Sequence, residues 1–210
     1  MSKPVLYGFD GSTYVRSVRM LLAEKGADYE QVPVDVLKGE PKEPEHLARH
    51  PFGKVPVLDI DGLRILETPS ILRYVNDTVA GPSFVPDSPA MRARMDTAMS
   101  VVDAYGYAAM VGLAAYHHFP DFIGGRDEAA QRERVGQARK ALGYLMSLKG
   151  DSPFIAGDVR SLADFYLAPP VAYVSLTDEA REAFDVPGFE NWWQRVQELE
   201  SFRTTAPDLG

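Results

Sequence analysis

Residues 9–13 contain the side chain best suited to hold a reactive anion. They lie between an expected strand and an expected helix, and Ser12 is of a type preferred at the N-cap. The start of a helix presents free N–H groups and a positive dipole end, which favour an anion such as a thiolate. A serine hydroxyl both accepts and donates, so Ser12 can cap the helix and still donate to a sulfur atom. A Ser12 that only caps is the simpler alternative.

Val55 and Pro56 form a second feature of chemical interest, at the start of an expected strand. If their peptide bond is cis, the chain turns sharply and exposes the N–H and C=O groups of Val55. An extended peptide could then pair with Val55 as an added strand. The alternative is an ordinary proline on an edge strand.

A third feature lies where another strand gives way to a helix. Thr68 followed by Pro69 is typical of an N-cap with proline at the first helical position. The Thr68 hydroxyl and the helix N–H groups could hold a carboxylate while Glu67 faces an amine. Capping with nothing bound is the alternative.

Three lysines, Lys38, Lys42 and Lys54, flank the same strand ends and could bind a second carboxylate. Each could equally be a solvated surface cation. Taken together, the four features describe a ligand with two carboxylates, an amine, an extended peptide backbone and a thiol.

The elements that would position these residues form a mixed first domain. We expect strands at 5–9, 29–34, 55–60 and 63–66, a first helix capped by Ser12 and ending just before Gly26, and further helices at 44–49 and 69–77. Asp61-Gly62 predicts a two-residue hairpin turn between the last two strands. The order is βαβ, short helix, ββα.

The rest of the chain shows only helical patterns. Helices are expected from Ser88-Pro89 to near Pro120, at 127–149, from Ser161 onward, and at 178–184 and 188–199. The predicted domains are therefore 1–80, α/β, and 88–210, all-α, joined by a linker at 81–87 that is rich in proline and serine.

Composition narrows the function. The 210 residues carry 22 Lys and Arg against 30 Asp and Glu, a net charge of −8, which argues against a nucleic-acid partner. No cysteine is present, so a reactive thiol would have to arrive with a ligand. The longest helical stretch carries Arg92, Arg94, Asp96 and Asp103, and the N-terminus lacks a signal-peptide pattern. These patterns predict a cytoplasmic protein with no membrane span.

Three stretches resemble one family. Residues 50–58 (HPFGKVPVL) are similar to N-P-F-G-x-V-P-x-L of the glutathione transferases, and residues 67–74 (ETPSILRY) to their E-S-x-A-I-x-x-Y. Residues 154–158 with 161–165 resemble the family's buried capping box, which implies a folding role for Ser161 and Asp164. The whole chain resembles a cytosolic, serine-type glutathione transferase of the phi-like or bacterial branch.

The resemblance implies a thioredoxin-like N-terminal domain, an all-helical C-terminal domain, and a homodimeric detoxification enzyme with no metal. Its reaction would join the glutathione thiolate to small hydrophobic electrophiles. Ser12 matches the serine that stabilises the thiolate, and Phe52 matches an aromatic that docks into the partner subunit. The implied glutathione-binding residues are Ser12, Lys42, Lys54, Val55, Pro56, Glu67 and Thr68.

The chain departs from the family pattern at four positions. Pro41 stands where phi-like enzymes often have histidine, and proline lacks the side-chain N–H for that carboxylate contact. Lys54 replaces glutamine, Thr68 replaces serine, and His50 replaces asparagine with no clear consequence. A non-catalytic binding protein, or a specialised relative (isomerase, dehalogenase, ether-cleaving enzyme or peroxidase), therefore remains as an alternative function.

Two further assignments stay open. Tyr7 is the second choice for the thiol activator and Thr13 the third. The electrophile should lie between the domains, although apolar residues at helical spacing are more often core. The residues expected to line that pocket are Asp10, Tyr14, Tyr107, Met110, Val111, Ala114 and His118.

Overall fold

The structure, a computed structural model, describes residues 3–207. The chain divides into two compact units, Met1–Ser83 with Glu200–Gly210, and Phe84–Leu199. The boundary after Ser83 falls within the expected linker. The end of the chain differs from expectation, because the last helix, α10 (Glu200–Thr204), belongs with the first unit.

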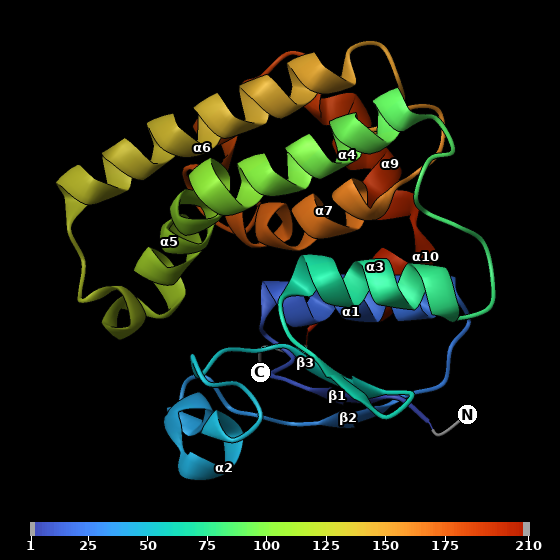
Figure 1. The fold of residues 1–210 in the computed structure, drawn as a ribbon. Coiled ribbons are helices and arrows are strands. Elements are labelled where there is room, and N and C mark those ends of the chain that lie inside the picture. Colours follow the sequence, from blue (N-terminus) through green and yellow to red (C-terminus); the bar gives the residue numbers. More distant parts are fainter. Residues whose placement is uncertain (1–2, 208–210) are drawn as a thin grey trace. The chain divides into compact units, whose positions relative to one another are not determined.

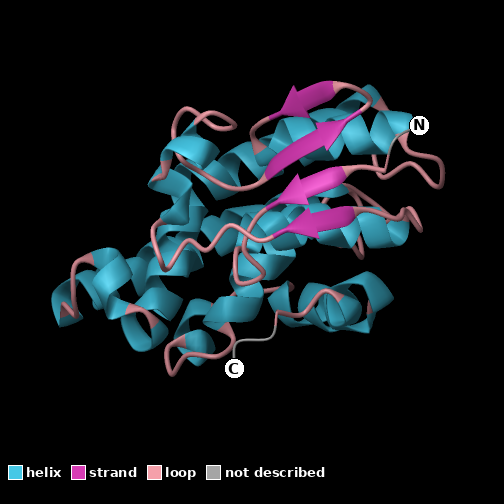
Figure 2. Ribbon diagram, turned by 90° about the horizontal axis from the view of Figure 1, so that it is seen from below, coloured by secondary structure: helices cyan, strands magenta, loops and turns pink. Residues whose placement is uncertain are grey.

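The first unit is built on a four-stranded sheet in the order β2-β1-β3-β4. The strands are β1 (Val5–Tyr7), β2 (Glu30–Val32), β3 (Val57–Ile60) and β4 (Leu63–Ile65). β1 runs parallel to β2 and antiparallel to β3, and β4 runs antiparallel to β3. Figure 2 shows the strands side by side. The expected βαβ and ββα order is confirmed, with strands one to three residues shorter than predicted.

Two helices, α1 (Thr13–Glu24) and α3 (Thr68–Thr78), lie next to each other over one face of this sheet (Figure 1). The paired strand residues Leu6 and Leu58 are fully buried on that face. The helices contribute apolar residues at helical spacing, Val15, Val18, Leu21 and Leu22 from α1 and Ile71, Leu72 and Val75 from α3. Because these residues recur at the helical period, they share one face of each helix and form the core against the sheet.

The β3–β4 hairpin turns at Asp61 and Gly62, both with positive φ, at 52° and 77°. This is the expected two-residue turn, since Ile60 pairs with Leu63. The segment between β2 and β3 carries two short helices, η1 (Glu40–Lys42) and α2 (Pro44–Leu47).

The second unit is helical throughout its described regular structure. Its helices are α4 (Pro89–Val101), η2 (Val102–Gly106), α5 (Tyr107–His118), η3 (Pro120–Ile123), α6 (Glu128–Lys149), α7 (Leu162–Val174), α8 (Ala180–Ala183) and α9 (Phe189–Glu198). The expected first helix is continuous from Pro89 to His118, but η2 in its middle is π-helical, which the sequence pattern did not indicate.

The Pro89–His118 helix is, among the described residues, long and apolar enough to cross a membrane by length and composition alone. Within its most apolar window, 56% of the residues are buried inside the protein. Core helices of soluble proteins pass the same test, so this is weak evidence for a span.

Asp164 organises the start of α7. Its carboxylate accepts hydrogen bonds from the Ser161 N–H at 2.8 Å and the Ser161 hydroxyl at 2.9 Å, which completes the expected capping box. It also accepts from the N–H of Ile155 at 3.0 Å and from Nε1 of Trp192 at 2.8 Å. The indole contact joins α9 to α7, a link that the sequence pattern did not reveal.

Candidate active site

Ser12 is the N-cap residue of α1, as expected. Its hydroxyl oxygen accepts from the N–H of Val15 at 3.4 Å, and its carbonyl accepts from the N–H of Arg16 at 2.9 Å. The side chain is half-buried. Capping uses an oxygen lone pair and leaves the hydroxyl hydrogen available to donate, so Ser12 can serve a ligand at the start of the helix.

The loop between β1 and α1 is fixed through Asp10. The Asp10 carboxylate accepts from Nε2 of Gln31 at 2.6 Å and pairs with Arg19 at 3.3 Å. Gln31 also donates to the carbonyl of Gly8 at 3.3 Å. Asp10 was expected in the electrophile pocket, but the structure gives it partners that order the loop carrying Ser12.

The Tyr7 hydroxyl is engaged on the sheet surface. It hydrogen-bonds to the Asp59 carboxylate, and the Arg49 guanidinium lies 4.6 Å from the ring centroid. Asp59 pairs with Val5, at the end of β1 opposite the Ser12 loop. The Tyr7 hydroxyl thus reaches along the sheet away from that loop, which favours Ser12 over Tyr7 as the thiol activator.

The Asp59 carboxylate is held mainly by Arg64. Two hydrogen bonds, at 2.8 and 2.7 Å, join it to that guanidinium across the β3–β4 pair. The Arg64 contact lowers the pKa of Asp59, and the Tyr7 hydroxyl lowers it further. Asp59 therefore stays a hydrogen-bond acceptor for Tyr7 at neutral pH. Thr13, the third choice, is buried and offers little surface to a ligand.

The Val55–Pro56 peptide bond is cis, the geometry on which the sequence argument depended. Within residues 3–207, the N–H and C=O groups of Val55 have no hydrogen-bond partner. Pro56 is buried, while Val55 is half-buried. The backbone of Val55 is therefore available to pair with an extended ligand.

The start of α3 differs from expectation by one residue. Glu67, with φ of 64°, occupies the N-cap position, and Thr68 is the first helical residue. Positive φ is uncommon outside glycine and costs on the order of 1 kcal/mol. The Glu67 side chain is exposed while Thr68 is buried, so Glu67 is the better placed of the two to meet a ligand.

The segments that carry Ser12, Val55 and Glu67 adjoin the same end of the sheet. β1 ends at Tyr7, opposite Val57, where β3 begins. β4 ends at Ile65, opposite Leu58. The Ser12 loop, the Val55 peptide and the start of α3 must therefore lie at one end of the sheet. Figure 1 labels the elements that they adjoin, β1, α1, β3 and α3.

The lysines have different surroundings. Lys38 pairs with Asp35 at 3.0 Å, so its charge is already matched. Lys42 donates from Nζ to the carbonyl of Phe52 at 3.0 Å. Lys54 is exposed, and its ammonium has no ion-pair partner among the described residues. Pro41 is buried and lacks a polar side chain, so it cannot replace the histidine of the family pattern.

A loop at residues 50–54 carries Phe52, whose side chain is 70% exposed. Gly53 has φ of 57°, and a Cβ atom there would come within 2.6 Å of the Pro41 carbonyl oxygen. Only glycine fits this position. Two buried histidines, His46 on α2 and His50 three residues beyond its end, anchor this loop, which the sequence analysis did not predict. Their spacing of four residues was the available signal.

The residues expected around the electrophile are divided between the units. Asp10 and Tyr14 belong to the first unit, and the other five lie on α5. On α5, Met110 and Ala114 are buried, Tyr107 and Val111 are half-buried, and His118 is exposed. Burial favours the core alternative for Met110 and Ala114, and the pocket itself stays a prediction.

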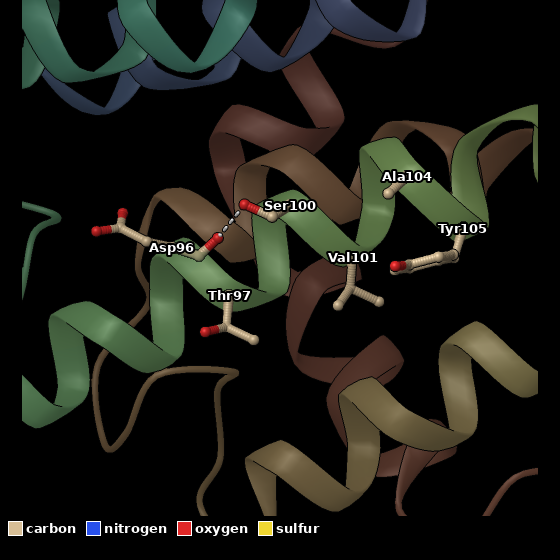
Figure 3. A pocket seen from close by; sticks show the side chains of 6 residues that line it. All are labelled: Asp96, Thr97, Ser100, Val101, Ala104 and Tyr105. Atoms are coloured by element: carbon tan, nitrogen blue, oxygen red, sulfur yellow. Dashed lines mark hydrogen bonds between the residues drawn. The ribbon is translucent and has the colours of Figure 1, made fainter.

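An open groove of about 410 Å³ lies along α4 and η2 (Figure 3). The Ser100 hydroxyl donates to the carbonyl of Asp96 at 2.9 Å on its wall. None of the predicted site residues lines it; the lining residues are Asp96, Thr97, Ser100, Val101, Ala104 and Tyr105.

No group of three metal-binding side chains occurs in the part of the chain that the structure describes. His117, part of an adjacent histidine pair, instead contacts the carboxylate of Glu179 at 2.8 Å. That contact ties α5 to the segment before α8.

Two sequence-family profiles match this chain, one in each unit. The profile described as "Glutathione S-transferase, N-terminal domain" matches residues 3–77, and "Glutathione S-transferase, C-terminal domain" matches residues 91–200. The chain belongs to the glutathione S-transferase family. Its two matched regions agree with the thioredoxin-like sheet unit and the helical unit described above.

Individual family members match along nearly the whole chain. A maleylacetoacetate isomerase of Pseudomonas aeruginosa is 33% identical, covering 96% of this chain and 92% of its own. Among solved structures, glutathione transferase F7 from Populus trichocarpa has a TM-score of 0.87 at 27% identity, covering 97% of each chain. Glutathione S-transferase I from maize, in complex with an atrazine glutathione conjugate, has a TM-score of 0.84 at 27% identity, covering 98% of this chain and 97% of its own.

Proposed function

We propose that this family member transfers small hydrophobic electrophiles to glutathione, with Ser12 as the thiol activator. The observation that carries the proposal is the placement of Ser12 at the start of α1, at the same sheet end as the unpaired Val55 peptide and Glu67. The maize relative in complex with a glutathione conjugate supports the same ligand class.

The activation step follows from the local electrostatics. A free thiol has a pKa near 8.5, so only a few per cent is thiolate at neutral pH. A donated hydroxyl hydrogen and the positive end of α1 both favour the anion. Lowering the thiol pKa by about two units requires roughly 2.7 kcal/mol, which these two effects together can supply.

The transfer itself is a nucleophilic substitution. The thiolate sulfur forms a bond to an electrophilic carbon, and the leaving group departs with its bonding pair, as chloride does from a chlorodinitrobenzene. Ser12 donates a hydrogen bond throughout and forms no covalent bond. This chemistry needs no metal.

The tripeptide would lie across the shared strand ends. Its cysteinyl backbone pairs with Val55 beside Pro56, and its γ-glutamyl end meets Glu67 and Thr68. Lys54, with an unmatched charge, takes the glycine carboxylate. Lys42 would assist only by leaving its present contact with the Phe52 carbonyl.

The oligomeric state and the cellular location are also part of the proposal. The 70% exposed Phe52 fits a role in docking a second copy of the chain, giving a homodimer. The absence of cysteine and the net charge of −8 fit a cytoplasmic detoxification enzyme that binds neither nucleic acid nor membrane.

Replacement of Ser12 tests the proposed activator. Ser12→Ala should raise the pKa of bound glutathione by about one to two units and lower kcat/KM about tenfold to a hundredfold at pH 6.5. Thiolate absorbance and turnover of a chlorodinitrobenzene measure both. Ser147→Ala, which removes an exposed hydroxyl bonded to the Tyr144 carbonyl, serves as the matched control. Full activity in Ser12→Ala would show that another group activates the thiol.

A glutathione-dependent cis–trans isomerase is the second candidate. The observation that favours it is the 33% identity to a maleylacetoacetate isomerase over 96% of this chain. Isomerisation would use the same thiolate, adding it to a carbon–carbon double bond and releasing it after rotation. Comparing kcat/KM for maleylacetoacetate and for chlorodinitrobenzene on one preparation separates the two. Calorimetry that shows no heat with glutathione would support a non-catalytic protein instead.

A further inference from the structure

Five polar contacts hold the loop at residues 50–54, which presents Val55. The N–H of His50 donates to the His46 carbonyl at 2.8 Å. Within the loop, the N–H of Gly53 donates to the His50 carbonyl at 2.8 Å. The Lys42 ammonium donates to the Phe52 carbonyl at 3.0 Å. The other two contacts use histidine rings. The N–H of Phe52 donates to Nδ1 of His50 at 3.3 Å, and Nε2 of His46 lies 2.7 Å from the Lys54 carbonyl.

The two histidines have opposite roles, fixed by their partners. A carbonyl oxygen only accepts, so Nε2 of His46 must carry hydrogen and donate. A backbone N–H only donates, so Nδ1 of His50 must be free of hydrogen and accept. Adding a proton to His46 would leave its contact intact, whereas adding one to His50 would remove the acceptor of the Phe52 N–H.

The surroundings of His50 favour the neutral form of its ring. The ring is 2% exposed and stacks with His46 at 6.5 Å between ring centroids. Burial lowers the pKa of His50, the nearby Glu67 carboxylate raises it, and His46 and Lys54 lower it. The ring is therefore neutral at pH 7.5 and takes a proton only below its ordinary value of about 6.5.

We propose that His50 is a positioning residue for glutathione binding, whose neutral ring holds the loop that presents Val55. This inference rests on the proposed function. Protonated His50 would release the Phe52 N–H and place a positive charge near Glu67, where it competes with the ammonium of the γ-glutamyl group. Both effects weaken glutathione binding in acid. The family's asparagine at this position would accept the same N–H without titrating.

Calorimetry at pH 7.5 and pH 5 with S-methylglutathione, whose sulfur cannot ionise and so adds no pH dependence of its own, provides the test. For the wild-type chain we expect the dissociation constant to rise about fivefold to tenfold on acidification, the effect of one lost hydrogen bond. In His50→Asn the ratio between the two pH values should fall to about one. His117→Gln, which removes a titratable ring from the second unit, should keep the wild-type ratio. An unchanged ratio in His50→Asn would overturn the proposal.

A measurement without ligand separates this proposal from the proposed function. Hydrogen exchange at the Phe52 amide, corrected for intrinsic rates, should show about fivefold to tenfold less protection at pH 5 than at pH 7.5 in the wild type. His50→Asn should show equal protection at both values. Equal protection in the wild type would overturn the role of His50. A wild-type chain that gives no heat with glutathione would refute the proposed function. Hydrogen exchange at the Phe52 amide would still test the role of His50 in that case.

Discussion

Single residues decide which hydroxyl can reach a thiol. Ser12 and Tyr7 are both plausible donors by type, and they lie five positions apart. Their surroundings differ, because Ser12 caps α1 while the Tyr7 hydroxyl is bonded to Asp59 at the far end of β1. A hydroxyl already paired with a carboxylate is a poor donor to a second anion.

Replacing Tyr7 separates a structural hydroxyl from a catalytic one. Tyr7→Phe removes one hydrogen bond to Asp59 and should lower the free energy of unfolding by about 1 kcal/mol. Bound-thiol pKa and kcat/KM should stay at wild-type values. Urea unfolding and a thiolate titration measure the two effects. A raised thiol pKa in this variant would transfer the activating role to Tyr7.

At the scale of elements, helix starts perform both binding and folding roles. α1 and α3 begin at the sheet end where the proposed ligand lies, so the positive ends of both helix dipoles lie there as well. The start of α7 has a different role, because the N–H and hydroxyl of its N-cap residue Ser161 both donate to the buried Asp164 carboxylate.

Removing the Asp164 carboxylate should destabilise the helical unit strongly. Asp164→Ala leaves the buried partners at Ile155, Ser161 and Trp192 without an acceptor, at a cost of about 3–5 kcal/mol in the free energy of unfolding. Urea denaturation, monitored by tryptophan fluorescence, measures this loss in the free energy of unfolding. The exposed Asp158→Ala is the control and should change stability by less than about 0.5 kcal/mol. Similar midpoints for both variants would contradict this account.

At the scale of the whole chain, the C-terminal segment returns to the first unit. Nη2 of the buried Arg16 donates to the Phe202 carbonyl at 2.7 Å, and its guanidinium lies 4.3 Å from the Phe202 ring centroid. The Ser201 hydroxyl donates to Glu24 at 2.6 Å. α10 is thereby fixed to α1, the helix that begins at Ser12.

Breaking this link should loosen the end of the chain. Arg16→Gln loses a charged hydrogen bond and a ring contact, and should lower the free energy of unfolding by about 2 kcal/mol. Limited proteolysis should cut after Leu199 faster than in the wild type. Arg203→Gln, which changes an exposed residue of α10, should leave both measurements unchanged. Equal cleavage rates in the two variants would argue against the anchoring role of Arg16.

The sequence by itself determined the element order, the first-unit core and the Ser161–Asp164 capping box. These follow from local causes: hydrophobic spacing, turn residues such as Asp61 and Gly62, and capping side chains. The same local signals identified Ser12 and the Val55–Pro56 pair as sites of interest.

Only the tertiary structure decided which side chains already have partners. Asp10, Lys38 and Tyr7 are bound to neighbours that the sequence pattern did not identify, and His50 accepts a hydrogen bond from the Phe52 N–H. The return of α10 to α1 was equally unpredictable. Helices and turns depend on residues a few positions apart, whereas these contacts depend on where distant segments meet after folding.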